Sequence, residues 1–266
     1  MKLGKLILNV FSLLGFLFAI NGVPGGVCEK LKIGASPTPH AEILNFVKSE
    51  LEKEGVELEI IEFTDYITPN IALGDKQLDA NFFQHKPYLD NFAKERDIAL
   101  ISLGTIHIEP MGLYSKKIKN IKELKEGAII AIPNDPTNEG RALLLLQSSG
   151  LIKLRPNAGF ECTPLDIVSN PKNLKFKELE AAQLPRVLDD VDGAIINGHY
   201  AIEAKLNPLK NALLLEKSNS PYANVVAVRL EAKDDPGVQK LMKALKSDKV
   251  RQYIINTYKG GVIPTF

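Results

Sequence analysis

The chain alternates strand-like and helix-like segments from residue 31 onward, and this alternation limits its fold more than any other feature. Residues 31–35 are a short apolar strand candidate. Residues 40–54 carry apolar side chains at helical spacing, and residues 56–63 alternate apolar and acidic side chains as a half-buried strand does. Strands and helices that alternate at this length are typical of an α/β fold with a parallel-rich sheet.

The rest of the chain continues the scheme. Helices are predicted at residues 69–73, 87–96, 121–125, 137–148, 184–190, 200–205 and within 237–259, and strands at 99–102, 106–114, 128–132, 178–179, 193–196 and 225–228. The 266 residues suffice for two domains of ordinary size, yet no Gly-, Ser- or Pro-rich linker separates two halves. We therefore expect two α/β lobes that the chain joins more than once, with a cleft between them.

The N-terminus has the order of a secretory leader. Lys2 and Lys5 precede an apolar stretch at residues 6–20, and small residues follow at 21–26. The apolar stretch is too short for a comfortable membrane span, so residues 1–27 are predicted to be a signal peptide and not an anchor helix. A buried N-terminal helix is the alternative. The leader predicts an exported protein of the cell envelope.

Cys28 stands directly after this leader. A cysteine followed by a polar tether in that position indicates lipid attachment in a bacterial lipoprotein, which would tie the protein to the membrane. Val27 departs from the pattern, because a small residue usually precedes the cysteine. The alternative is ordinary cleavage around Gly25 and release of a soluble exported protein. The second cysteine, Cys162, lies too far along the chain for a disulfide framework, and a single bridge to Cys28 stays open.

Charge and motif content argue against two classes of function. Without the leader, 31 basic residues face 32 acidic ones, and no basic cluster suggests a nucleic-acid partner. The four histidines are scattered, with no two at helical metal-ligand spacing: His40, His85, His107 and His199. No catalytic, phosphate-binding or metal motif occurs, so we expect no enzyme, cofactor or metal. A hydrolase or a metal receptor assembled from dispersed residues is the alternative.

Arg141 is placed unusually for a cation. The strand at residues 128–132 runs into turn residues, and a helix that begins near Thr137 carries Arg141 in its opening turns. Helix starts favour negative charge by about 0.3 to 1 kcal/mol per group, so this cation needs an anion nearby. Asp135, Glu139 or an acid elsewhere in the fold can supply it. The other interpretation is a ligand carboxylate held by the guanidinium fork.

Aromatic and amide side chains gather at the ends of predicted elements. Residues 79–89 pack two Phe, a His and a Tyr into an expected loop, which is either a core plug or the wall of an apolar pocket. Tyr66 lies just past a strand end, where open α/β sheets bind ligands. Asn197 and Asn224 also border strands and offer both donors and acceptors, although each alone is more often a turn or cap residue.

Five motifs resemble the methionine-binding lipoprotein family in order and spacing. They lie at residues 63–70, 78–85, 132–141, 183–186 and 220–224. The likeness extends over nearly the whole mature chain, from about residue 31 to 266. It implies a two-lobe fold of the type II periplasmic binding proteins with a ligand cleft between lobes, and delivery of the ligand to the membrane subunits of an ABC importer. Val27 is the main departure from the family.

The resemblance also implies roles for seven residues. An apolar pocket for the thioether would come from Tyr66, Phe83, His85 and Tyr88, and Arg141, Asn197 and Asn224 would hold the amino-acid head group. Little at these motifs could neutralise an α-ammonium by charge, so neutral oxygens of the Asn side chains would have to accept its protons. The role of His199 is open, because many relatives carry another polar residue there.

The sequence therefore predicts an extracytoplasmic receptor for L-methionine. Lobe 1 is expected at residues 28–112 and 225–266, and lobe 2 at 113–224. D-methionine, a methionine dipeptide or another apolar amino acid remain alternatives, because one methylene is worth only about 0.8 kcal/mol and pocket depth is not visible in a sequence. A surface adhesin or host-interaction protein on the same fold is the alternative from another class.

Overall fold

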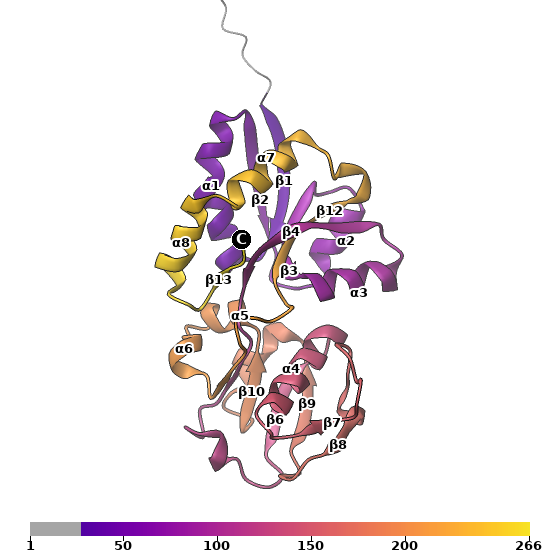
Figure 1. Cartoon of the computed structure of the whole chain (residues 1–266), viewed down its shortest axis with the longest axis vertical. Helices are drawn as coiled ribbons and strands as arrows, with labels where there is room; N and C mark the ends of the chain where they lie inside the picture. Colours follow the sequence, from indigo (N-terminus) through magenta and orange to yellow (C-terminus); the bar gives the residue numbers. More distant parts are fainter. Residues whose placement is uncertain (1–27) are drawn as a thin grey trace, which may run out of the picture.

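The computed structural model describes residues 28–266, so the predicted signal peptide lies outside the described residues. Two sheets, each flanked by helices, form two lobes stacked along the long axis (Figure 1). The first sheet has the order β13-β4-β12-β3-β1-β2. Its strands are β1 (Glu29–Ala35), β2 (Val56–Glu62), β3 (Ala80–His85), β4 (Leu100–Ile108), β12 (Asn224–Arg229) and β13 (Ile263–Pro264). The predicted two-lobe α/β fold is confirmed.

The second sheet has the order β11-β5-β10-β6-β9. Its strands are β5 (Gly112–Tyr114), β6 (Ile129–Pro133), β9 (Lys175–Leu179), β10 (Gly193–Ile196) and β11 (Leu214–Leu215), and a separate hairpin joins β7 (Lys153–Leu154) to β8 (Ile167–Ser169). Both sheets are mixed. The parallel-rich expectation is correct for β1 with β2 and β3 and for β6 with β9 and β10, but β12 pairs antiparallel with β3 and β4, and β5 pairs antiparallel with β10 and β11.

Helices cover each sheet. The first lobe has α1 (Glu42–Lys53), α2 (Thr68–Gly74), α3 (Lys86–Arg96), α7 (Pro236–Leu245) and α8 (Asp248–Tyr258), and the second has α4 (Pro136–Ser148), α5 (Gly198–Glu203) and α6 (Pro208–Asn211). Short 3-10 segments occur at Ile121–Glu123, Pro164–Asp166, Ala181–Val187 and Leu230–Ala232. The predicted helix at 184–190 is this third segment, where Pro185 interrupts regular helical hydrogen bonding.

The core of each lobe follows the sequence pattern. In the first lobe, the apolar stripe of α1 packs Ile43 and Leu51 against buried Ile33 of β1 and Leu58 of β2. In the second lobe, the leucine run of α4 packs on β6 and β10. Burying one such side chain contributes about 1.5 to 3 kcal/mol, so each sheet and its helices form a lobe with a core of its own.

The chain passes between the two sheets at neighbouring places in space. One passage lies between the end of β4 and the start of β5, and the other between β11 and β12. A backbone hydrogen bond from Glu216 N to Met111 O, 2.9 Å long, ties the two passages together. Side chains of these segments therefore reach the space between the lobes. The lobe boundaries proposed at 112/113 and 224/225 stay a prediction.

The prediction of a loop at residues 79–89 is wrong. Residues Ala80–His85 form β3, all of whose residues are buried, and α3 begins at Lys86. A strand buried on both faces lacks the apolar–polar alternation by which strands are recognised. Two of its three polar side chains, Asn81 and Gln84, are compensated by an amide network, in which Gln84 Nε2 lies 2.7 Å from Asn70 Oδ1 and Asn81 Nδ2 lies 2.8 Å from the same oxygen.

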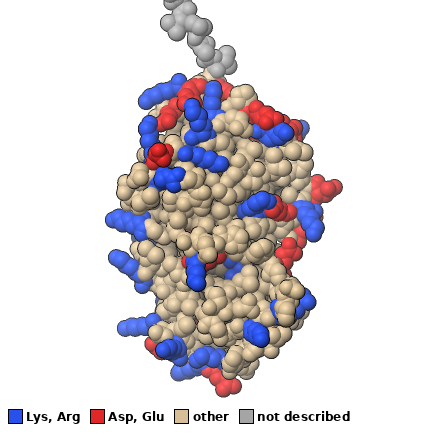
Figure 2. Space-filling view, viewed as in Figure 1, with Lys and Arg blue, Asp and Glu red and all other residues tan. Residues whose placement is uncertain are grey.

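Three further observations concern export and partners. Cys28 is exposed, Cys162 is buried, and both are free thiols. Within residues 28–266, no helix is long and apolar enough to cross a membrane. On the face drawn in Figure 2, basic and acidic side chains are interspersed.

Candidate ligand-binding site

A small cavity lies between the two lobes. All seven residues predicted to bind ligand line it, namely Tyr66, Phe83, His85, Tyr88, Arg141, Asn197 and Asn224. Five more residues line it that the sequence analysis did not assign to a site, namely Gln84, Glu109, Asn138, Gly198 and His199. The structure thus brings the predicted residues together, and their binding of a ligand stays a prediction.

An aromatic wall forms one side of the cavity. The ring centroid of Tyr66 lies 6.1 Å from that of Phe83 and 5.8 Å from that of Tyr88. Tyr88 donates its hydroxyl to the backbone oxygen of Tyr66 at 2.9 Å, which fixes the loop after β2 against α3. Phe83 is only 2% exposed and faces this wall, whereas its neighbour Phe82 packs in the main core of the lobe. Alternation along β3 therefore directs Phe83 to the cavity.

His85 joins the wall to the second lobe as a neutral imidazole. Its Nδ1 accepts the Tyr88 backbone N–H at 3.1 Å and caps α3, so the ring proton is on Nε2, which lies 3.1 Å from Asn138 Oδ1. Burial, together with the charge of Arg141, lowers the pKa of His85 to about 3. The ring is therefore uncharged at neutral pH and offers one donor across the cleft.

Asn138 links three elements at the cavity floor. Its amide nitrogen donates to Asp135, the cap of α4, and its oxygen accepts from both His85 and the side chain of Asn197 at 2.8 Å. Asn197 Nδ2 therefore has a hydrogen-bond partner. Asn197 Oδ1, in contrast, is buried and has no hydrogen-bond partner within residues 28–266. An unpaired buried acceptor that lines a cavity is available for a donor from a ligand.

Arg141 has a protein acid as its partner. Its Nε lies 3.1 Å from Glu216 Oε1, its Nη2 lies 2.5 Å from Glu216 Oε2, and the guanidinium carbon stands 4.5 Å from the centroid of the Tyr222 ring. Of the anions that the sequence analysis left open, an acid elsewhere in the fold is the one that pairs with Arg141 here, 75 residues away in sequence. A contact of Arg141 with a ligand carboxylate stays a prediction.

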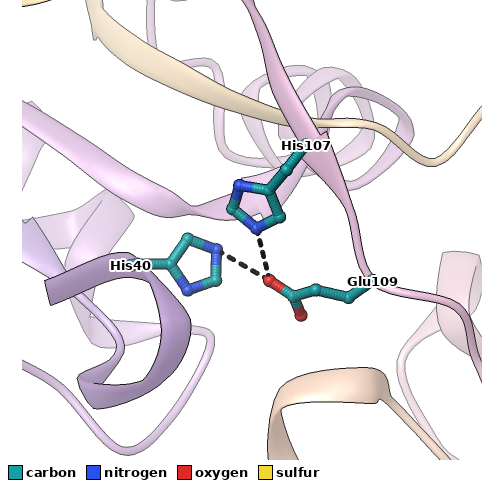
Figure 3. A group of neighbouring side chains, drawn as sticks. All are labelled: His40, His107 and Glu109. Atoms are coloured by element: carbon teal, nitrogen blue, oxygen red, sulfur yellow. Dashed lines mark hydrogen bonds and ion pairs between the residues drawn. The ribbon is translucent and has the colours of Figure 1, made fainter. Parts of the chain in front are cut away.

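The carboxylate of Glu109 contacts three of the four histidines, although these are scattered in the sequence. His107 Nε2 lies 2.6 Å and His40 Nε2 3.2 Å from Glu109 Oε1 (Figure 3), and His199 Nδ1 lies 3.4 Å from Glu109 Oε2. Burial raises the pKa of Glu109, but the imidazoles outweigh it and hold the pKa well below the usual carboxyl range. The cavity therefore contains a buried carboxylate that the sequence analysis did not anticipate.

The packing around Glu109 requires a glycine on the facing helix. A Cβ added at Gly198, the first residue of α5, would lie 2.7 Å from Glu109 Cβ. His199 follows directly, and its Nδ1 also lies 3.3 Å from the Tyr66 hydroxyl of the other lobe. The role of His199, open in the sequence, is thus a contact to both Glu109 and the aromatic wall. Its position directly after a strand end was the available signal.

Comparison with known proteins identifies the family. The model of the NlpA lipoprotein family matches residues 31–266. This chain belongs to the NlpA lipoprotein family. The membership confirms the predicted resemblance, and it confirms a substrate-binding protein and not an enzyme.

Relatives of this NlpA-family protein agree in sequence and structure. A protein described as the D-methionine-binding lipoprotein MetQ of Salmonella typhimurium is 49% identical over 214 residues, which is 80% of this chain and 79% of the relative. Outer membrane lipoprotein 3 of Mannheimia haemolytica is 43% identical over 266 residues, 99% of either chain. The predicted location, exported to the cell envelope, is confirmed by these lipoprotein relatives.

A solved relative extends the likeness to the fold. The structure of a nutrient-binding protein from Burkholderia cenocepacia bound to methionine is 50% identical, with a TM-score of 0.86, over 89% of this chain and all of that chain. At this identity the two chains share the positions of their sheets and helices. The cavity described above therefore belongs to a fold that holds an amino acid in that relative.

Proposed function

We propose that this protein captures L-methionine in the cavity between its lobes and delivers it to the membrane subunits of an ABC importer. The observation that carries the proposal is the division of one cavity into an aromatic wall and a polar end. Tyr66, Phe83 and Tyr88 form the wall, and Arg141 and Asn197 lie at the polar end. A thioether side chain fits the first and an amino-acid head group the second.

Burying the methionine side chain would contribute about 1.5 to 3 kcal/mol. Tight binding therefore also needs charge-assisted hydrogen bonds at the head group, each worth about 1.5 to 3 kcal/mol.

D-methionine is the second candidate, because the Salmonella relative is described as binding it. Exchanging hydrogen and side chain at the α-carbon moves either the thioether or the ammonium from its place. Isothermal titration of the purified protein with L-methionine, D-methionine, glycyl-methionine and leucine compares the candidates directly. We expect L-methionine to bind most tightly. Tighter binding of D-methionine or of the dipeptide would overturn the choice of ligand, and binding of none would overturn the function.

We also propose that Cys28 carries the lipid that holds the protein at the membrane. Cys28 is exposed at the start of β1, at the far end of the first lobe from the cavity, so an anchor there leaves the cleft free (Figure 1). Mass spectrometry of the mature N-terminus should find an added diacylglyceryl mass, and Cys28→Ala should release the protein from the membrane fraction. A mature chain that begins near Gly26 with a free thiol would contradict this.

A further inference from the structure

Glu109 is a buried carboxylate at the cavity, and no lysine or arginine among the described residues pairs with it. It is 5% exposed and lines the cavity from the segment that joins the lobes. Within residues 28–266, three histidines lie within ion-pair distance of its carboxylate, and no lysine or arginine side chain does. Burying an ionised carboxylate costs several kcal/mol unless its charge is paired. Among the described residues, the site therefore lacks a positive charge that pairs with the carboxylate of Glu109.

The neighbouring cations do not supply it. Arg141 is engaged by the carboxylate of Glu216, and its contact with Glu109 is a 2.9 Å hydrogen bond from Nη2 to the backbone oxygen only. His40 is fully buried, and this burial lowers its pKa to about 3 although Glu109 opposes the shift. The ring is therefore neutral at neutral pH, and its Nε2 lies within hydrogen-bond distance, 3.2 Å, of Asn224 Oδ1.

Acceptor atoms remain available at the cavity. Among the described residues, Glu109 Oε1 has the two shorter imidazole contacts, to His107 and His40, whereas Oε2 has a single 3.4 Å ion-pair contact, to His199. Asn197 lines the same cavity, and its Oδ1 has no hydrogen-bond partner in this part of the chain. A carboxylate accepts about four hydrogen bonds, and a primary ammonium donates three. The free acceptors thus match the donors of an ammonium group.

A metal ion fits the same cluster less well. One ligand atom each of His40, His107 and Glu109 lies within 4.8 Å of the others. Histidines that bind metal almost always donate the other ring N–H to an acceptor. Here Nδ1 of both His40 and His107 is buried and has no hydrogen-bond partner within residues 28–266. Metal binding at Nε2 would leave two buried N–H groups unpaired, so a proton on Nε2 is the better assignment.

We infer that Glu109 is the counter-ion of the ligand's primary ammonium group, with Asn197 Oδ1 as a further acceptor, and that this pair selects amino acids over acids that lack the amine. The inference rests on the proposed function, because it assigns one end of the same ligand. It replaces the expectation that only neutral oxygens accept the ammonium protons. Gly198 permits the arrangement, since a larger residue would push α5 away from Glu109.

The test compares methionine with 4-(methylthio)butanoic acid, which has the same thioether and carboxylate but no amine. Isothermal titration of the wild-type protein should give a preference for methionine of roughly 10- to 150-fold, the effect of one charge-assisted hydrogen bond. Glu109→Gln should reduce this preference to a few-fold. Glu139→Gln is the matched control, because Glu139 is similarly buried at 6% exposure but does not line the cavity, and it should keep the full preference.

Each result decides the inference. A preference that persists in Glu109→Gln, or a wild-type protein that binds both compounds equally, would overturn it while methionine binding itself stands. If Glu109→Gln does not fold, the wild-type comparison can still overturn the inference, because equal binding of both compounds would mean that no group of the site recognises the ammonium. Failure of the wild-type protein to bind methionine would overturn the proposed function and this inference together. Saturable Zn²⁺ binding that Glu109→Gln abolishes would also overturn it, by assigning the carboxylate to a metal.

Discussion

The guanidinium of Arg141 forms a bidentate ion pair with the carboxylate of Glu216, with Nε 3.1 Å from Oε1 and Nη2 2.5 Å from Oε2. The pair joins α4 to the second passage between the lobes, and Glu216 Oε2 also accepts the backbone N–H of Met111 in the first passage at 3.2 Å. Arg141 therefore does two things at once. It fixes the passages between the lobes, and it presents a cation at the cavity.

The first prediction separates these two roles of Arg141. Methioninamide lacks the ligand carboxylate, so the wild-type protein should prefer methionine over it. In Arg141→Ala that preference should largely disappear if the guanidinium contacts the carboxylate, as a double-mutant cycle requires. Titration of both ligands into both proteins measures it. Arg155→Ala breaks an exposed pair with Asp166 and should leave the preference unchanged.

A preference that survives in Arg141→Ala would mean that the guanidinium serves Glu216 alone. The Arg141→Ala protein should be less stable in either case, because removing one partner of a buried ion pair leaves the charge of Glu216 unpaired. The expected loss in unfolding free energy is about 3 to 5 kcal/mol. A chemical denaturation curve of the ligand-free variant therefore has to accompany the titration.

The second prediction uses two adjacent phenylalanines on β3. Phe83 faces the aromatic wall and Phe82 the main core of the first lobe, and both are buried. Phe82→Ala should lower the unfolding free energy by about 3 to 5 kcal/mol, as large core truncations do. Phe83→Ala should cost less stability and far more methionine affinity. A Phe83→Ala protein that is severely destabilised but binds methionine normally would mean that Phe83 is a core residue and not part of the pocket wall.

The sequence was sufficient to place Tyr66, Asn197 and Asn224 next to strands, where open α/β sheets bind ligands. This alone did not bring them together, because Tyr66 and Asn224 border strands of the first sheet and Asn197 a strand of the second. The family resemblance then implied that the two lobes face each other. The strand β3 was missed, because its alternation is hidden when both faces are buried.

The charges of the site could not be predicted from local patterns. Glu109 meets His40 and His199 only because segments 69 and 90 residues away fold against it. Likewise, nothing in the helix that carries Arg141 indicates Glu216. Ion pairs of this kind depend on tertiary contacts alone, and they have no spacing that a sequence reveals. The buried carboxylates were therefore the part of the site that only the structure supplied.

The third prediction concerns pH and His85. Its folded pKa of about 3 lies below the ordinary value of 6.5, so the unfolded chain takes up a proton that the folded protein excludes as pH falls. This contribution to stability is complete above pH 6.5 and is lost as pH falls toward 3. His85→Asn keeps a side chain that can cap α3 but does not titrate.

The stability of ligand-free wild type relative to His85→Asn should therefore fall by about 2 to 3 kcal/mol between pH 6 and pH 4. Urea unfolding of both proteins at several pH values measures the difference. Other titrating groups, such as Glu139 with its pKa raised to about 7 by burial, occur in both proteins and cancel. A difference that stays constant with pH would show that His85 titrates normally in the folded protein.

The last prediction is that the lobes close around the ligand. Contacts already cross the cleft, because the Tyr200 hydroxyl donates to Thr64 O at 2.9 Å and His85 Nε2 lies 3.1 Å from Asn138 Oδ1. A net hydrogen bond is worth about 0.5 to 1.5 kcal/mol, so Tyr200→Phe should weaken methionine binding roughly 2- to 12-fold by favouring the open state. Tyr253→Phe, on α8 and away from the cleft, is the control.

Small-angle scattering should give a smaller radius of gyration with methionine than without it. Identical curves, together with an unchanged affinity of Tyr200→Phe, would mean that the lobes do not move and that the ligand enters a preformed cavity.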